Sequence, residues 1–181
     1  MKISTVMNAN VQTCRPDESL GQAAMLMWKH DCGFVPVIDQ DSQRVVGAIT
    51  DRDICMATAT RHIAPDTAKV EDTMCTRPIT IRAEDEVDNA LTTMKTHQVH
   101  RIPVVDSSDR LAGIISFSDI VRLASTDGIL RSIGDHDIVA VYRAIKAPRP
   151  GEPVGAGAQL DRWKDDQPAA ADRAFGETQE S

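Results

Sequence analysis

The chain has 181 residues, 41% of them hydrophobic, which is enough to bury one sizeable core or two small ones in series. Only 3% of the residues are aromatic, so the sequence lacks the aromatic platform on which single-stranded nucleic acids stack. The net charge of −7 argues against general attraction to nucleic acids or anionic membranes. No apolar run approaches the roughly 18 residues of a membrane span. We therefore expect a cytoplasmic protein without a nucleic-acid or membrane partner.

Four cysteines occur, and none belongs to a C-x-x-C pair or stands at zinc-finger spacing from a histidine. They are Cys14, Cys32, Cys55 and Cys75. We predict no metal site and expect reduced thiols, because free cysteine packs as a small hydrophobic residue. The N-terminus also lacks the apolar stretch of a signal peptide, which again favours the cytoplasm.

The sequence contains an internal repeat. The segment GAITDRDI at 47–54 returns as GIISFSDI at 113–120, a spacing of 113 − 47 = 66 residues. In both copies a glycine lies near the end of an apolar strand, a hydroxyl residue follows, and a carboxylate stands three positions later where a helical pattern begins. The hydroxyl and carboxylate are Thr50 and Asp53 in the first copy, and Ser116 and Asp119 in the second. A polar group is therefore predicted at each strand-to-helix junction.

The first copy begins with a brief strand predicted at 11–14. A helix follows, with N-cap candidates at 17–19 and an apolar stripe of period 3.6. Two β-branched runs at 33–39 and 44–49 predict strands separated by a polar turn, and a second helix is predicted from 51 to about 60. The stripe consists of Leu20, Ala23, Ala24 and Met27.

The second copy repeats this order. A brief strand is predicted at 79–81, strands at 100–106 and 110–115, and a helix from 117 to about 124. Its first helix carries an apolar stripe at the equivalent positions, namely Val87, Ala90, Leu91 and Met94. The proline inside the first strand of each pair lacks a donor, so that strand should lie at an edge or open there.

The predicted fold class is α/β (α+β), with two β-α-β-β-α repeats packed as a pseudo-symmetric pair. Each repeat has about 60 residues, and a domain of that size is only marginally stable by itself. We therefore expect the two repeats to pack sheet to sheet around a shared core. One or two helices, broken near Gly134, should follow the second repeat, and the charged end rich in Pro, Gly and Ala should be disordered. The predicted boundaries are 1–60, a linker at 61–69, 70–125, a helical extension at 126–146, and an acidic tail at 147–181.

The two copies of G-h-h-[ST]-x-x-D, where h is a hydrophobic residue, together with h-P-V-h-D, resemble a tandem pair of CBS domains, or Bateman module. The resemblance covers about residues 1–125, and the stretch TDRDI at 50–54 is similar to small stand-alone bacterial members. It implies a non-enzymatic regulatory module that binds AMP, ADP or ATP between its two domains, with S-adenosylmethionine or NAD as alternatives. It also implies a homodimer and an unidentified regulated protein partner.

The residues have a chemistry of their own beside that resemblance. An ionised carboxylate accepts hydrogen bonds from both hydroxyls of a ribose, and a hydroxyl at a helix N-terminus favours a phosphate. The alternative for each pair is an ordinary helix cap with a first-turn charge. The backbone around Pro36 and Pro103 is predicted to contact an adenine edge, with Val35 or Ile102 packing on its face.

In the family, the hydroxyl and carboxylate of one domain face the proline-bearing strand of the other, so the resemblance implies two sites. The first predicted site comprises Thr50, Arg52, Asp53, Thr80, His100, Arg101, Ile102 and Pro103. The second, weaker predicted site comprises Thr13, Gly33, Phe34, Val35, Pro36, Ser116 and Asp119. Cations occur in the first alone, where Arg101 offers a bidentate fork to phosphate. The second is expected to be empty, to bind weakly, or to prefer a ligand without phosphate.

Catalysis is not predicted, because no phosphate-binding, hydrolase or metalloprotease motif occurs and the histidines form no catalytic spacing. Two alternatives remain open beside the nucleotide sensor. One is a ligand-free interaction scaffold that acts through 127–145 and the tail. The other is a redox- or metal-linked protein that uses the four cysteines.

Overall fold

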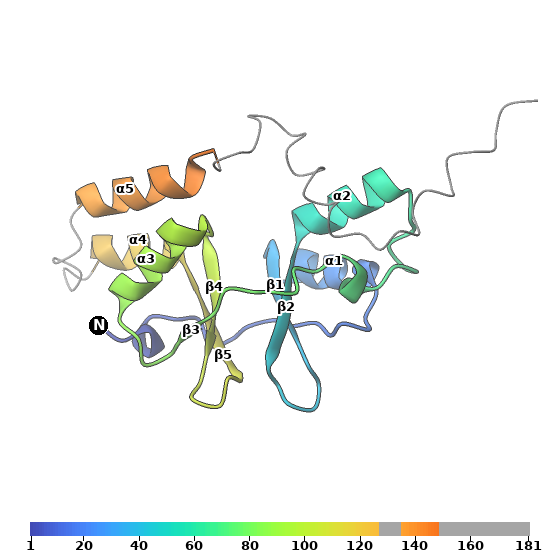
Figure 1. Cartoon of the computed structure of the whole chain (residues 1–181), viewed down its shortest axis with the longest axis horizontal. Coiled ribbons are helices and arrows are strands. Elements are labelled where there is room, and N and C mark those ends of the chain that lie inside the picture. The colour runs from blue at the N-terminus through green and yellow to red at the C-terminus, as the bar shows by residue number, and fades with distance from the viewer. Residues whose placement is uncertain (127–134, 149–181) are drawn as a thin grey trace, which may run out of the picture. The chain divides into compact units, whose positions relative to one another are not determined.

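The computed structural model describes residues 1–126 and 135–148 (Figure 1). The predicted helix break near Gly134 and the predicted disorder of the tail lie outside these ranges. Residues 1–146 form one unit, which contains both sequence repeats. Apart from the first brief strand, the order of helices and strands is the predicted one, and the mixed α and β fold class is confirmed.

The first repeat contains two helices and a two-stranded sheet. Its elements are the 3-10 turn η1 (Ile3–Thr5), α1 (Leu20–Lys29), β1 (Phe34–Ile38), β2 (Val45–Thr50) and α2 (Asp51–Arg61). The brief strand expected at 11–14 is reduced to a single bridge, in which Cys14 pairs with Val37 of β1.

The second repeat contains a three-stranded sheet and one additional helix. Its elements are η2 (Val70–Asp72), β3 (Ile81–Arg82), α3 (Val87–His97), β4 (Arg101–Val105), β5 (Leu111–Ser116), α4 (Phe117–Thr126) and α5 (Asp135–Lys146). Helix α5 packs against α3 and adds residues to the core of the second repeat (Figure 1).

Helix α1 begins at a capping box. The Ser19 hydroxyl accepts from the backbone N–H of Gln22 at 3.1 Å, and the Gln22 side chain accepts from the N–H of Ser19 at 2.8 Å. These two bonds satisfy donors that a helix start would otherwise leave unpaired. The predicted apolar stripes of α1 and α3 face the cores, with Ala24 half-buried and the other seven residues buried.

Both hairpins place their proline against the neighbouring strand in the same register. Pro36 lies opposite Ala48, and Pro103 lies opposite Ile114. On the other side of β4, strand β3 pairs with Val104 and Val105 alone, so the ladder is open at Pro103 as predicted. Pro36 uses its carbonyl, which accepts from the N–H of Cys14 at 3.2 Å.

The leading segment of each repeat packs on the other repeat. Ile3 of η1 is fully buried in the core of the second repeat, and its N–H donates to the carbonyl of Asp85 at 2.8 Å. Val70 of η2 is fully buried in the core of the first repeat, where its N–H donates to the carbonyl of Glu18 at 2.9 Å. The two repeats therefore exchange equivalent short segments, and each core includes residues from both halves of the chain.

The sequence predicted one core shared between the two sheets, and this prediction was wrong. Two separate hydrophobic clusters form, one in each repeat. The physical reason lies in the exchanged turns and in α5. Ile3 and Val70 each complete one cluster, and Val141 and Ile145 of α5 extend the second.

Candidate functional site

The predicted polar group of the first repeat lies at the junction of β2 and α2. Thr50 is the N-cap of α2, and its hydroxyl accepts from the N–H of Asp53 at 3.1 Å. Oδ2 of Asp53 accepts in return from the backbone N–H of Thr50 at 2.9 Å and from its hydroxyl at 2.7 Å. The capping role is therefore present. The cap bonds occupy Oδ2 of Asp53, and no described residue donates to its other carboxylate oxygen, Oδ1.

The second repeat contains the same junction with one addition. Oδ2 of Asp119 accepts from the N–H of Ser116 at 3.2 Å and from its hydroxyl at 2.5 Å, while the Ser116 hydroxyl accepts from the Asp119 N–H at 3.1 Å. Oδ1 of Asp119 accepts from Arg122 at 2.7 Å. In the second repeat, unlike the first, both carboxylate oxygens already have partners.

Backbone hydrogen bonds join the three elements of the first predicted site. Cys75 exchanges bonds of 2.9 and 3.1 Å with Ala48 of β2, and Ile81 pairs with Val104 of β4. The segment 75–81, which contains Thr80, therefore runs from the strand that ends at Thr50 to the strand that carries Pro103. Six residue steps span at most about 20 Å, so β2 and β4 are held near each other.

The second predicted site is connected in the same way. Asn8 exchanges two bonds of 2.9 Å with Ile114 of β5, and Cys14 bonds to β1 on either side of Val37. The segment 8–14, which contains Thr13, therefore joins the strand that ends at Ser116 to the strand that carries Pro36. The hairpins also meet directly, because the Leu111 N–H donates to the Gln43 carbonyl at 3.1 Å.

A cationic group lies at the start of β4. His100 is half-buried, and its carbonyl accepts from the N–H of Phe117 at 2.8 Å. Burial lowers the pKa of His100, and the positive charges of Lys146 and Arg101 lower it further. Arg101 is exposed, and no described residue forms an ion pair with it. Lys146, which sequence reasoning did not include, comes from α5 more than 40 residues away, and no local pattern connects it to this site.

The remaining predicted residues differ in how accessible they are. Arg52 and Thr80 are exposed, whereas Thr13, Gly33 and Phe34 are half-buried. Pro36 and Pro103 are buried. Val35 and Ile102 are fully buried within the two cores, and the packing of their side chains on an adenine face stays a prediction. They face inward because they alternate with residues on the other side of the strand.

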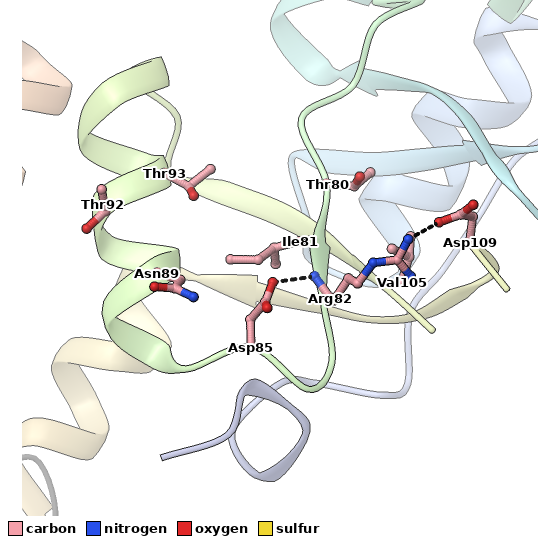
Figure 2. A pocket seen from close by; sticks show the side chains of 9 residues that line it. All are labelled: Thr80, Ile81, Arg82, Asp85, Asn89, Thr92, Thr93, Val105 and Asp109. Carbon is pink, nitrogen blue, oxygen red and sulfur yellow. Dashed lines mark hydrogen bonds and ion pairs between the residues drawn. The ribbon is translucent and has the colours of Figure 1, made fainter. Parts of the chain in front are cut away.

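A pocket of about 500 Å³ adjoins the first predicted site at Thr80 (Figure 2). Figure 2 shows the Arg82 side chain reaching toward Asp109, with which it forms an ion pair of 2.8 Å, while Asp85 accepts from the Arg82 N–H at 3.1 Å. These polar groups therefore pair with one another inside the pocket. Sequence reasoning missed this pocket, because its lining comes from β3, α3 and the β4–β5 turn.

Neither a metal centre nor a membrane span is found in the part of the chain that the structure describes. Within 1–126 and 135–148, no three His, Cys, Asp or Glu side chains gather so as to hold a metal ion. None of the helices in these ranges is long and apolar enough to cross a bilayer. Of the four cysteines, Cys14 is buried, Cys32 is half-buried, and Cys55 and Cys75 are exposed.

The chain is similar to a small protein of known structure with the same fold. Hypoxic response protein 1 of Mycobacterium tuberculosis is 33% identical over 143 residues, which are 79% of this chain and 92% of that protein. The crystal structure of Hypoxic Response Protein I with two coordinated zinc ions aligns with a TM-score of 0.62 and 33% identity. That alignment covers 67% of this chain and 98% of the other.

Two further crystal structures contain adenosine compounds. The CBS domain pair of protein MJ0100, in complex with 5′-methylthioadenosine and S-adenosyl-L-methionine, is 27% identical, with a TM-score of 0.61 over 68% of this chain and 95% of the other. CBSX2 from Arabidopsis thaliana, in complex with AMP, is 26% identical, with a TM-score of 0.59 over 68% and 95%. The family model of the CBS domain matches residues 3–59 and 70–126. The chain therefore belongs to the CBS-domain family, with two copies of the domain that exchange their leading segments.

Proposed function

We propose that this protein is a non-enzymatic regulatory module that binds an adenosine nucleotide, AMP, ADP or ATP, at the first predicted site. The observation that carries this proposal is the open Oδ1 of Asp53 beside the N-terminus of α2. Oδ2 holds the helix cap, and Oδ1 is left to accept from the hydroxyls of a ribose. The two relatives with bound AMP or S-adenosylmethionine support an adenosine compound as the ligand class.

The cationic start of β4 favours a ligand with phosphate. Arg101 is exposed and unpaired among the described residues, so its guanidinium is available as a fork for phosphate oxygens. His100 adds a second positive charge and donates from both ring nitrogens when it is protonated. S-adenosylmethionine carries no phosphate, and its single carboxylate is accompanied by positive ammonium and sulfonium groups, which makes a nucleotide the better fit for this cationic group.

The proposed mechanism is a population shift. A nucleotide that contacts the end of β2, the segment 75–81 and β4 touches both repeats. Its binding therefore favours the relative arrangement of the two repeats in which all three elements contact it. A regulated protein, which is still to be identified, recognises the changed surface. We also propose that the protein works as a homodimer, which sedimentation equilibrium of the full chain tests.

Calorimetric titration with AMP, ADP, ATP, NAD and S-adenosylmethionine tests the nucleotide proposal. We expect AMP, ADP or ATP to bind, and Arg101→Ala to weaken that binding by about tenfold or more, since a bond to a charged group contributes about 1.5–3 kcal/mol. The matched control is Lys95→Ala, which removes an exposed cation of the same repeat outside the predicted site. Equal affinity of Arg101→Ala and the parent chain would remove the phosphate-binding role.

A further inference from the structure

Lys146, the last residue of α5, lies near the cationic start of β4. The carbonyl of His100 accepts from the N–H of Phe117 at 2.8 Å, which ties the start of β4 to the start of α4. The ring of Tyr142, on α5, stacks on the ring of Phe117 with centroids 6.1 Å apart. Nζ of Lys146 lies 5.9 Å from the centroid of the same Tyr142 ring. These contacts together bring the end of α5 to His100.

The backbone of α5 is held in this place by its packing on the second repeat. Val141 and Ile145 are buried in the core of that repeat, and α5 runs alongside α3 (Figure 1). The side chain of Gln98, just after α3, donates to the carbonyl of Ala144 at 3.0 Å. Lys146 itself is exposed, and its four-carbon stem is flexible. The ammonium group can therefore reorient while the helix stays in position.

Three positive groups gather here without an acidic partner. They are His100, Arg101 and Lys146, and no described residue forms an ion pair with any of them. The positive charges of Lys146 and Arg101 add to burial in lowering the pKa of His100, so the three groups repel one another. The described arginines that form ion pairs in this repeat are Arg82, Arg110 and Arg122. In a chain with a net charge of −7, such a group of unpaired cations favours an anion as its partner.

The first repeat has no equivalent of this cationic group. With the repeat offset of 67 residues, the counterparts of His100 and Arg101 are Gly33 and Phe34. Within residues 1–126, no helix of the first repeat corresponds to α5. The cationic group therefore belongs to the first predicted site alone, and α5 gives that site a charge that the repeat pattern does not supply.

The number of cations indicates how many phosphates they fit. A single phosphate carries about two negative charges, which the guanidinium of Arg101 and a protonated His100 balance. The planar fork of Arg101 suits two oxygens of one phosphate, whereas a lysine ammonium is a compact point charge with no fixed direction. Each further phosphate adds negative charge that these two residues do not balance. Lys146 is the remaining cation of the group.

We propose that Lys146 binds the phosphates beyond the first, so that the first predicted site prefers ADP and ATP to AMP. This inference rests on the proposed function, because it requires a nucleotide at that site. The ammonium of Lys146 leaves the ring of Tyr142 to reach the phosphates, and a cation over an exposed aromatic ring is held only weakly. Lys146 is thus a specificity-determining residue that comes from outside both repeats.

Calorimetric titration of the full chain with AMP, ADP and ATP, in buffer without divalent cations, tests the preference. We expect the parent chain to bind ADP and ATP about tenfold or more tightly than AMP. Lys146→Gln should remove most of this difference by weakening ADP and ATP, and should leave the AMP affinity within about twofold. Lys146→Arg keeps the positive charge and should retain most of the preference.

Arg143→Gln is the matched control. Arg143 is exposed, lies in the same last turn of α5, and is not among the charges that lower the pKa of His100. Both substitutions remove one positive charge from the negative end of the same helix, so they change the stability of α5 and the net charge alike. We expect Arg143→Gln to leave all three nucleotide affinities within about twofold.

Three outcomes would overturn this inference while the proposed function stands. The first is a parent chain that binds AMP as tightly as ADP and ATP. The second is an equal loss of AMP and ATP affinity in Lys146→Gln. The third is an equal loss of ATP affinity in Lys146→Gln and Arg143→Gln, which would show a general effect of charge. A parent chain that binds none of the three nucleotides would overturn both the inference and the proposed function.

Discussion

Arg122 donates to Oδ1 of Asp119 at 2.7 Å, whereas the equivalent position in the first repeat is Met56, which has no charge to offer Asp53. This single difference makes the two carboxylates unequal although their helix caps are the same. It predicts that the first site binds a ribose and that the second is blocked until Arg122 moves.

Exchanging these two residues should exchange the behaviour of the sites. Arg122→Met frees Oδ1 of Asp119, and we expect the calorimetric stoichiometry to rise above that of the parent chain. Met56→Arg gives Asp53 a competing partner and should weaken nucleotide binding by about tenfold. If Met56→Arg leaves both affinity and stoichiometry unchanged, the open oxygen of Asp53 is not part of the binding site.

Nucleotide affinity should depend on pH through His100. Its pKa lies below the usual value in the free protein, and a bound phosphate would raise that pKa by favouring the imidazolium. A complex with the higher pKa takes up protons, so affinity should increase as pH falls through the pKa of the bound form. Calorimetry across pH 5.5–8 measures this trend.

His100→Asn is the control for this pH dependence, since the phosphate of the nucleotide also titrates near pH 6. The difference between the parent chain and His100→Asn isolates the histidine. Parallel pH profiles for the two proteins would show that His100 does not contact the phosphate.

The cysteines should react at very different rates. Burial raises the pKa of the Cys14 thiol to about 12, with a further increase from the negative charge of Glu18. The thiolate is the reactive form, so Cys14 should resist a thiol reagent in the native protein, while Cys55 and Cys75 react quickly. Mass spectrometry of the labelled chain identifies the sites. Rapid labelling of Cys14 would mean that the first repeat opens readily.

Gly47→Ala should destabilise the protein. An added Cβ would lie 2.5 Å from Sδ of Met74 and 3.0 Å from the carbonyl oxygen of Cys75, which bonds to Ala48. Overpacking of this kind costs about 1–3 kcal/mol, and the free energy of unfolding in urea measures the loss. The variant with Gly47→Ala and Met74→Ala should recover part of it. No loss in the single variant would contradict the close crossing of segment 75–81 over β2.

The repeat and the apolar stripes made the order and type of most elements predictable. Ala23 and Ala90 are fully buried on their helices, because spacings of three and four residues place an apolar stripe on one face. The helix cap at Thr50 was also foreseen, as the alternative to a binding role. The sequence therefore offered both a helix cap and ligand binding as predictions for the same junction.

The exchange of segments could not be read from the sequence. Ile3 and Val70 lie in 3-10 turns of three residues, too short to show a periodicity, and the repeat places each beside its own copy rather than on the other. The contact of Arg122 with Asp119 was missed because the prediction for this junction paired Asp119 with Ser116 alone. The place of Lys146 and the packing of α5 on α3 depend on distant contacts that no local pattern shows.

The central claim is that the carboxylate of Asp53, and not that of Asp119, binds the ribose of an adenosine nucleotide. Calorimetric titration of Asp53→Asn and Asp119→Asn with AMP, ADP and ATP tests it most directly, because Asn keeps the shape and an acceptor oxygen for the helix cap. We predict that Asp53→Asn loses the binding while Asp119→Asn retains it, with both variants folded by circular dichroism. Binding that survives in Asp53→Asn, or a parent chain that binds none of the three nucleotides, would contradict the claim.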